Sequence, residues 1–147
     1  MRHALAPGFA DPVGFDVDDC STQRNLSAEG RSQARAIGEK FRGAGIRAAD
    51  VYSSAWCRCL DTARLLGLGP VEKLDALNSF FQARERRDAQ TRDLEAFIQA
   101  RTSNTPLVLV THQVNISALT GRATRYGETI VATLDADGKV EVLGSID

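Results

Sequence analysis

The chain has 147 residues, of which 43% are hydrophobic and 25% charged, and its net charge is −1 at pH 7. This balance suits one globular domain, and the near-zero charge excludes a bulk attraction to nucleic acid or anionic lipid. No apolar run approaches the roughly 18 residues of a membrane span. We therefore predict a single domain over residues 1–147, with no nucleic-acid partner and no membrane span.

The N-terminal part of the chain is predicted to be a long loop followed by an amphipathic helix. Residues 6–25 are punctuated by proline and glycine and carry four aspartates, and an ordered loop of this length is usually functional. Ser27 is a suitable N-cap, and apolar residues recur at helical spacing from Ala34 to Phe41. We expect the helix to end at Gly43.

The rest of the chain alternates between helical and extended patterns. The residues Leu-Val-Leu-Val-Thr are β-formers in a continuous apolar run, which is typical of a strand buried on both faces of a parallel sheet. The expected elements are a strand at 50–54, a helix over 55–66 capped by Ser53 or Ser54, a helix over 91–102, a strand at 107–111, a helix over 115–121 and a C-terminal hairpin around Asp137 and Gly138.

This order of elements predicts an α/β fold, with helices on both faces of a mostly parallel sheet. In open α/β sheets the functional site lies beyond the carboxyl ends of the strands. His112 directly follows the predicted strand at 107–111, and Arg58 follows the strand at 50–54. Arg2 and His3 would qualify as well if they ended a strand. We therefore expect these four side chains to meet in one crevice.

Two histidines and two arginines suit the chemistry of phosphoryl transfer. A guanidinium group presents a rigid fork of donors to phosphate oxygens, and two forks can neutralise developing charge. A neutral imidazole can attack phosphorus and carry the phosphoryl group covalently. Nearby arginines lower the imidazole pKa and so keep that nucleophile unprotonated. The side chains supply the positive charge, so we predict no metal and no other cofactor.

The three cysteines, Cys20, Cys57 and Cys59, are too few for a disulfide scaffold. On a helix Cys57 and Cys59 would point to different faces, which argues against a shared metal. We expect them to be small buried residues, with a disulfide from Cys20 to Cys57 or Cys59 as the alternative in an oxidising compartment.

Four segments, taken in order, resemble the histidine phosphatase superfamily, also called the phosphoglycerate mutase-like family. They are Arg-His-Ala at 2–4, Leu-Ser-Ala-Glu-Gly-Arg-Ser-Gln-Ala at 26–34, Ser-Ser-Ala-Trp-Cys-Arg-Cys-Leu-Asp-Thr-Ala at 53–63 and Val-Thr-His-Gln-Val-Asn at 110–115. The family has Gly where this chain has Ala4. The resemblance covers most of the chain and is greatest to small bacterial phosphatases, and it implies a three-layer α/β/α sandwich.

The resemblance also implies roles for individual residues. His3 would be the nucleophile that forms a phosphohistidine, and Arg2, Arg58 and His112 would clamp the phosphoryl group. Residues facing the substrate would be Gln23, Arg24, Asn25 and Gln113, although a polar loop that caps the helix explains the first three equally well.

The proton donor is the main departure from the family pattern. Mutase-like members carry a Glu shortly after the second arginine segment, where this chain has Asn78 and Ser79, and the other branch carries an acid where this chain has Gln113. Candidate acids elsewhere are Asp16, Asp18, Asp19, Glu85 and Glu128, each of which could equally be a solvated surface charge. A phosphoramidate substrate depends less on such an acid, because its leaving nitrogen is readily protonated.

The start of the chain is the second departure. Family members have an apolar strand before Arg-His, whereas only Met1 precedes it here. We expect that part of this first strand is missing from the sequence. The location is accordingly open: cytoplasmic for the sequence as given, periplasmic if an export signal lies upstream.

The sequence thus predicts a metal-independent phosphatase that hydrolyses a small phosphate ester through phosphohistidine at His3. One alternative is a phosphatase that acts on phosphohistidine in a phosphoprotein. Another is a phosphate-binding module without turnover. The partner is accordingly a small phosphate ester or a phosphoprotein, and the sequence sets no oligomeric state.

Overall fold

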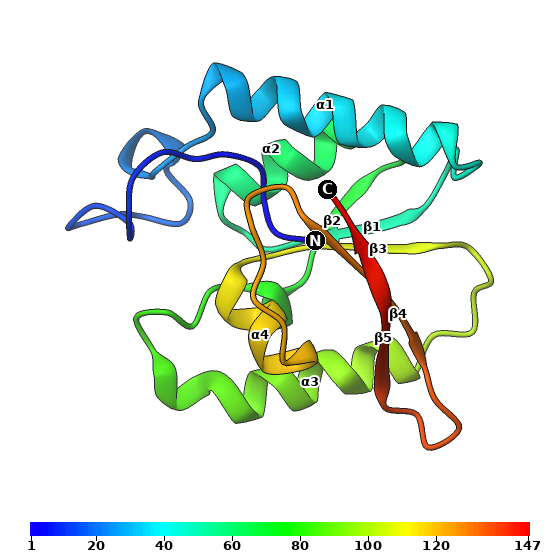
Figure 1. Cartoon of the computed structure of the whole chain (residues 1–147). Coiled ribbons are helices and arrows are strands. Elements are labelled where there is room, and N and C mark those ends of the chain that lie inside the picture. Colours follow the sequence, from blue (N-terminus) through cyan, green and yellow to red (C-terminus); the bar gives the residue numbers. More distant parts are fainter.

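The computed structural model describes residues 1–147 as a three-layer α/β fold (Figure 1). Its parallel sheet has the strand order β2-β1-β3, and two helices lie on each side of it. The fold class predicted from the sequence is confirmed. The strands are β1 (Asp50–Ser53), β2 (Val71–Lys73) and β3 (Leu107–Val110), and the helices are α1 (Ala28–Gly43), α2 (Cys57–Leu66), α3 (Arg87–Gln99) and α4 (Gln113–Thr120).

Helix α1 begins where the sequence predicts and packs closely on the chain that follows His3. The Ser27 hydroxyl accepts a hydrogen bond from the Gly30 amide, so the N-cap is confirmed. A Cβ on Gly30 would lie 2.0 Å from the Leu5 carbonyl oxygen. Only glycine therefore allows α1 to approach this segment, and the contact fixes the backbone just beyond His3.

Helix α2 begins later than predicted and has a different N-cap. The cap residue is Trp56, whose side chain makes no capping hydrogen bond, and the helix starts at Cys57. The expectation that Ser53 or Ser54 caps this helix is wrong. The Ser54 hydroxyl instead accepts from the Trp56 amide at 3.3 Å and lies 2.9 Å from His112 Nε2. The Ser54 side chain therefore contacts His112 and does not act as the N-cap of α2.

Strand β3 is buried on one face, not on both as the apolar run predicts. Val108 and Val110 are buried in the core beneath α1 and α2, whereas Leu107 and Leu109 are half-buried. The two leucines line a cavity of about 420 Å³ between β3, α3, α4 and the C-terminal hairpin. The opposite face of the sheet is thus incompletely filled, which explains the alternating burial.

The first residues of the chain lie between β3 and the C-terminal hairpin, near the centre of Figure 1. This hairpin consists of β4 (Thr129–Leu134) and β5 (Val140–Ile146) and forms as predicted. The His3 amide donates to the Thr111 carbonyl, and the Arg2 amide donates to the Glu128 carbonyl, both at 3.0 Å. These bonds place His3 beside the carboxyl end of β3, as the topology rule for α/β sheets requires.

No helix of the structure is both long enough and apolar enough to cross a membrane. The loop over residues 6–25 is ordered as expected and contains one short 3₁₀ helix, η1 (Cys20–Thr22). Two further 3₁₀ helices, η2 (Asp75–Leu77) and η3 (Arg84–Arg86), connect β2 to α3.

A disulfide joins Cys20 in this loop to Cys57, the first residue of α2, while Cys59 is free and buried. Of the two pairings left open by the sequence, the structure contains the one to Cys57. The bond closes a loop with a sequence separation of 37 residues. Such a closure restricts the unfolded chain and stabilises the fold by about 3–4 kcal/mol in the chain-entropy model.

We therefore expect Cys20→Ser/Cys57→Ser to lower the free energy of unfolding in urea by about 3–4 kcal/mol. A reductant should destabilise the wild type by a similar amount and leave this double variant unchanged. Cys59→Ala is the matched control, because it removes a thiol but keeps the disulfide and should retain the response to reductant. Equal stability of the wild type with and without reductant would contradict the disulfide.

Candidate active site

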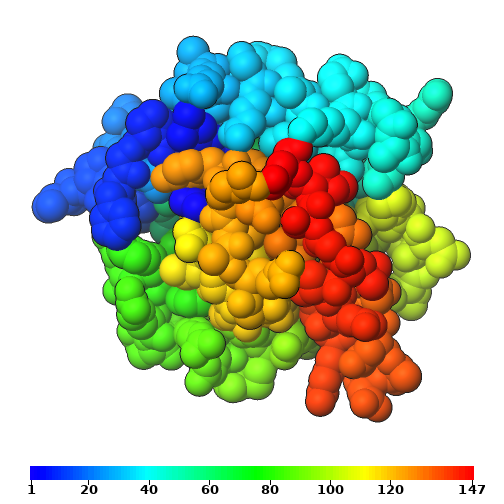
Figure 2. All heavy atoms as spheres, in the orientation of Figure 1, coloured from blue at the N-terminus to red at the C-terminus, as the bar shows by residue number.

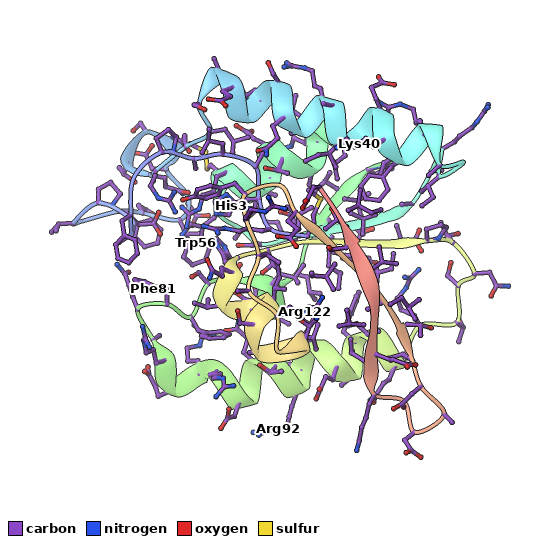
Figure 3. All side chains as sticks on the ribbon, in the orientation of Figure 1. His3, Lys40, Trp56, Phe81, Arg92 and Arg122 are labelled. Atoms are coloured by element: carbon purple, nitrogen blue, oxygen red, sulfur yellow. A yellow bond between two sulfur atoms is a disulfide. The ribbon has the colours of Figure 1, made fainter.

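Three of the predicted site residues form one buried cluster at the carboxyl end of the sheet. His3, one of the three, is labelled in Figure 3. His3, Arg58 and His112 are only 2%, 3% and 5% exposed. Arg58 Nε donates to His3 Nε2 at 3.2 Å, and Arg58 Nη2 donates to His112 Nδ1 at 3.4 Å. The guanidinium group of α2 therefore joins two imidazoles that are far apart in the sequence.

The hydrogen bonds of His3 fix its tautomer. Its Nδ1 lies 2.8 Å from the backbone carbonyl of Ala4, which can only accept, so Nδ1 carries the proton. Nε2 is left with a lone pair, and this lone pair accepts from Arg58 Nε. The unprotonated nitrogen of His3 is therefore held beside a cation, an arrangement that suits a nucleophile for an anionic substrate.

His112 is oriented by contacts on both ring nitrogens. Since Arg58 donates to Nδ1, the proton lies on Nε2, which donates to the Ser54 hydroxyl at 2.9 Å. The Trp56 ring packs edge-on against the imidazole, with 5.3 Å between ring centroids. The His3 ring lies 5.5 Å away on another side. His112 is thus held in one orientation beside His3.

Burial and positive charge keep both histidines neutral. Burial, followed by the charge of the neighbouring Arg58, lowers the pKa of His3 to about 3. Burial also lowers the pKa of His112 well below its ordinary value, again with Arg58 as the next cause. The His3 imidazole is therefore unprotonated at neutral pH.

These pKa shifts predict that the protein loses stability in mild acid. The unfolded chain takes up protons on its histidines near pH 6.5, whereas folded His3 does so only near pH 3. The stabilisation is therefore complete above about pH 6.5 and is lost as the pH falls toward 3. Each buried histidine should contribute about 1.4 kcal/mol per pH unit within this window.

Urea unfolding at pH 7, 6 and 5 measures this effect. We expect His3→Asn, which cannot titrate, to reduce the pH dependence by about 1.4 kcal/mol per pH unit below pH 6. Subtracting the variant from the wild type cancels the contribution of carboxylates to the pH dependence, because they titrate in both proteins. An unchanged pH dependence in this variant would show that His3 titrates normally in the folded chain.

Arg2 lies at the edge of the cluster. Its guanidinium group stacks on the Tyr126 ring at 3.8 Å and donates to Gln113 Oε1 at 2.9 Å and to the Thr124 carbonyl at 2.7 Å. The Tyr126 ring lies 5.5 Å from that of His3. Arg2 acts on the buried histidines through its charge, which helps to lower the pKa of His3. Gln113 is exposed and serves here as the acceptor for Arg2.

The polar segment at 23–25 fastens the long loop. Gln23 Oε1 accepts from the Cys57 amide at 3.0 Å, and Asn25 Nδ2 donates to the Cys20 carbonyl at 2.6 Å. Arg24 Nε donates to the Ala10 carbonyl at 3.0 Å. These bonds join the loop to α2 and to itself, and none of them caps α1, whose N-cap is Ser27. The role of the three residues toward a substrate stays a prediction.

The acids suggested by the sequence lie on the surface or in local turns. Asp16 and Asp19 are exposed and accept hydrogen bonds from backbone amides two residues further along, Asp18 and Ser21. The remaining candidates are Asp18 and Glu85, which are exposed, and Glu128, which accepts from the Arg125 amide at 2.8 Å.

A different aspartate reaches the cluster. Asp11, from the same loop, accepts hydrogen bonds from both terminal nitrogens of Arg58, with 3.2 Å from Nη2 to Oδ2. Trp56 Nε1 donates to the same carboxylate at 2.9 Å, and the Asp11 side chain is only 9% exposed. The sequence shows Asp11 as one of four loop aspartates, and no spacing distinguishes it, because the loop path alone brings it to Arg58.

Thr62 is a second residue that only the structure identifies. Its hydroxyl accepts from the Ala4 amide at 3.0 Å and donates to the Arg58 carbonyl at 2.7 Å. The threonine thereby ties the residue after His3 to the helix that carries Arg58. Its place in the Asp-Thr-Ala segment was the available signal for this positioning role.

Comparisons with known proteins agree with this geometry. The model of the histidine phosphatase superfamily (branch 1) matches residues 19–82, which include Arg58. No curated protein matches the sequence significantly.

Solved structures share the fold at low sequence identity. The protein histidine phosphatase SixA, complexed with tungstate, has a TM-score of 0.69 and 17% identity, over 99% of this chain and 93% of that chain. YhfR from Bacillus stearothermophilus has a TM-score of 0.66 and 17% identity, over 81% and 83% of the two chains. Mycobacterial glucosyl-3-phosphoglycerate phosphatase Rv2419c has a TM-score of 0.57 and 22% identity, over 80% and 76%. In its family-model match over residues 19–82 and in its fold, the chain is therefore similar to the histidine phosphatase superfamily (branch 1).

Proposed function

We propose that residues 1–147 form one phosphatase domain that hydrolyses a phosphate monoester through a phosphohistidine at His3, without a metal ion. The observation that carries the proposal is the unprotonated Nε2 of His3, whose lone pair accepts a hydrogen bond from the guanidinium group of Arg58. A neutral imidazole among fixed cations is suited to attack an anionic phosphorus centre.

The reaction follows from the positions of these groups. His3 Nε2 attacks phosphorus, and the bond from phosphorus to the leaving oxygen breaks. The Arg58 guanidinium group would stabilise the charge on the transferring phosphoryl oxygens, and His112, whose Nε2 proton is held by Ser54, would orient Arg58 through Nδ1. Water then attacks phosphorus and releases His3. Because buried contacts fix Arg58 beside His3, its charge is already close to the reacting nitrogen.

Phosphate release from 4-nitrophenyl phosphate, with and without EDTA, tests the proposal. An aryl phosphate has a good leaving group, so its turnover does not depend on an efficient acid. We expect turnover that EDTA does not change, together with a protein-bound phosphoryl group in acid-free rapid quench. A folded chain that binds inorganic phosphate without turnover would instead be the phosphate-binding module.

A phosphohistidine protein phosphatase is the second candidate. It is supported by Asn78, which stands at the position where mutase-like members carry their acid. This side chain accepts from the Ala55 amide at 2.8 Å and supplies no acidic proton. The similarity in fold to SixA, a protein histidine phosphatase, points the same way. Faster turnover of a phosphohistidine peptide than of a phosphate ester would favour this substrate.

A further inference from the structure

Arg58 has no free donor in this structure. A guanidinium group carries five N–H donors. Nε donates to His3, Nη1 to Asp11 and to the Arg24 carbonyl at 3.4 Å, and Nη2 to Asp11 and His112. A phosphoryl group that approaches His3 must therefore displace Asp11 from Arg58. Carboxylate and phosphoryl oxygens accept hydrogen bonds from the same guanidinium nitrogens, so the two groups compete for them.

The segment that carries Asp11 has an unusual backbone. Ala10, directly before it, has a positive φ of 57°, which is costly for a residue with a side chain. Arg24 holds this conformation through its bond to the Ala10 carbonyl. Gly8 and Gly14 also have positive φ and bracket the segment. The loop thus presents Asp11 to the cluster in a defined geometry, between two positions where the backbone can pivot.

The C-terminal end of the loop is anchored while its tip is open to solvent. The disulfide at Cys20 and the Gln23 bond to the Cys57 amide fasten one end to α2. Phe9 and Val13, on either side of Asp11, are 86% and 107% exposed. Residues near the start of the chain, coloured blue, form a projecting lobe at the left of Figure 2. Movement of the tip would therefore expose little additional apolar surface.

We propose that Asp11 is the proton donor of this site, held on Arg58 until the phosphoryl group of the substrate replaces it. The proposal rests on the proposed phosphatase function. Asp11 is the one acidic side chain that the structure brings into contact with Arg58, and Trp56 Nε1 holds the same carboxylate beside His112.

The exchange changes the protonation of Asp11. In the resting site burial raises the pKa of this carboxyl group, but the hydrogen bonds and charge of Arg58 outweigh burial and hold it below its ordinary value. Once the phosphoryl group binds Arg58, the Asp11 carboxylate loses its ion pair and lies near the negative charge of the phosphoryl group. Both changes favour the protonated form, so Asp11 takes up a proton from solvent.

Asp11 donates a proton in the first step of the reaction and accepts one in the second. As His3 Nε2 bonds to phosphorus, the bond to the leaving oxygen breaks, and this oxygen keeps the electron pair and takes the proton of Asp11. Water next attacks phosphorus and transfers a proton to the Asp11 carboxylate, and the electron pair of the broken bond returns to His3 Nε2. General acid catalysis of this kind contributes about 10²–10⁴-fold.

Two substrates with different leaving groups test the proposal in the disulfide-bonded chain. We expect Asp11→Asn to lower kcat/KM for 2-glycerol phosphate, a poor leaving group, by about 100-fold or more. For 4-nitrophenyl phosphate the change should be below about 5-fold, because the leaving group needs no proton. Asp50→Asn is the matched control: its carboxylate pairs with Arg101 outside the cluster, and its activity toward both esters should match that of the wild type.

Three results would overturn the proposal. Equal losses for both esters in Asp11→Asn would show that the aspartate positions Arg58 and donates no proton. Unchanged or increased activity toward both esters would show that Asp11 only competes with the phosphoryl group for Arg58 and donates no proton. A wild-type chain that binds inorganic phosphate and hydrolyses neither ester would overturn the proposed function together with the donor, and calorimetry with phosphate separates this case from the first two.

Discussion

His3→Ala is expected to lower the turnover of 4-nitrophenyl phosphate by at least about 10⁴-fold. The lone pair on His3 Nε2 faces Arg58, and the Ala4 carbonyl fixes the proton on the other nitrogen. Alanine removes the atom that would bond to phosphorus, and the remaining cluster can stabilise charge without forming the intermediate. Steady-state phosphate release and rapid-quench detection of a phosphoprotein together measure the loss.

His112→Ala is the matched control for this experiment. It removes the other buried imidazole of the cluster but leaves the proposed nucleophile, so turnover should fall while the phosphoprotein still forms. Thermal unfolding checks that each variant is folded. A phosphoprotein that persists in His3→Ala and disappears in His112→Ala would reverse the two roles.

Arg58→Ala should lower kcat/KM by about 10²–10³-fold, and Arg58→Lys should lower it less. The guanidinium group reaches His3, His112 and Asp11 at once from a buried position. Lysine keeps the charge but loses the planar fork that matches two phosphoryl oxygens. Titration with inorganic phosphate should show the same order of affinities, with alanine the weakest.

Loss of Arg58 also leaves a nearly buried carboxylate without its partner, which destabilises the fold. Arg58→Ala/Asp11→Ala removes both charges, and its turnover of 4-nitrophenyl phosphate, which does not depend on the proposed proton donor, separates this effect from the loss of activity. Arg101→Ala is the control for the removal of an arginine paired with aspartate, because Arg101 pairs with Asp50 outside the cluster. Equal activity of Arg58→Ala and Arg58→Lys would show that the fork geometry is irrelevant.

Three elements differ from what the hydrophobic pattern predicts, each for its own reason. The run at 107–111 predicts burial on both faces, yet Leu107 and Leu109 border a cavity. Strand β2 was not anticipated, because its three residues, Val71, Glu72 and Lys73, show little apolar pattern and two are exposed. Helix α3 starts at Arg87 rather than at 91, since the charged residues of its first turn face solvent.

The sequence by itself determined the fold class and predicted that Arg58 and His112 lie at one edge of the sheet, whereas His3 was placed with them by the family resemblance. Parallel strands bring their carboxyl ends to one edge, so residues that follow different strands must meet there. This rule depends only on the order of elements, which hydrophobic periodicity and the Ser27 cap already indicate.

The tertiary structure alone decided which acid approaches the cluster and which cysteines pair. Asp11 resembles the other aspartates of its loop in every local respect, and its contact with Arg58 depends on the path of the loop over α2. The choice of Cys57 over Cys59 likewise depends on the point at which α2 begins. Long-range contacts of an irregular loop carry no periodic signal, because no repeating geometry relates its side chains to their partners.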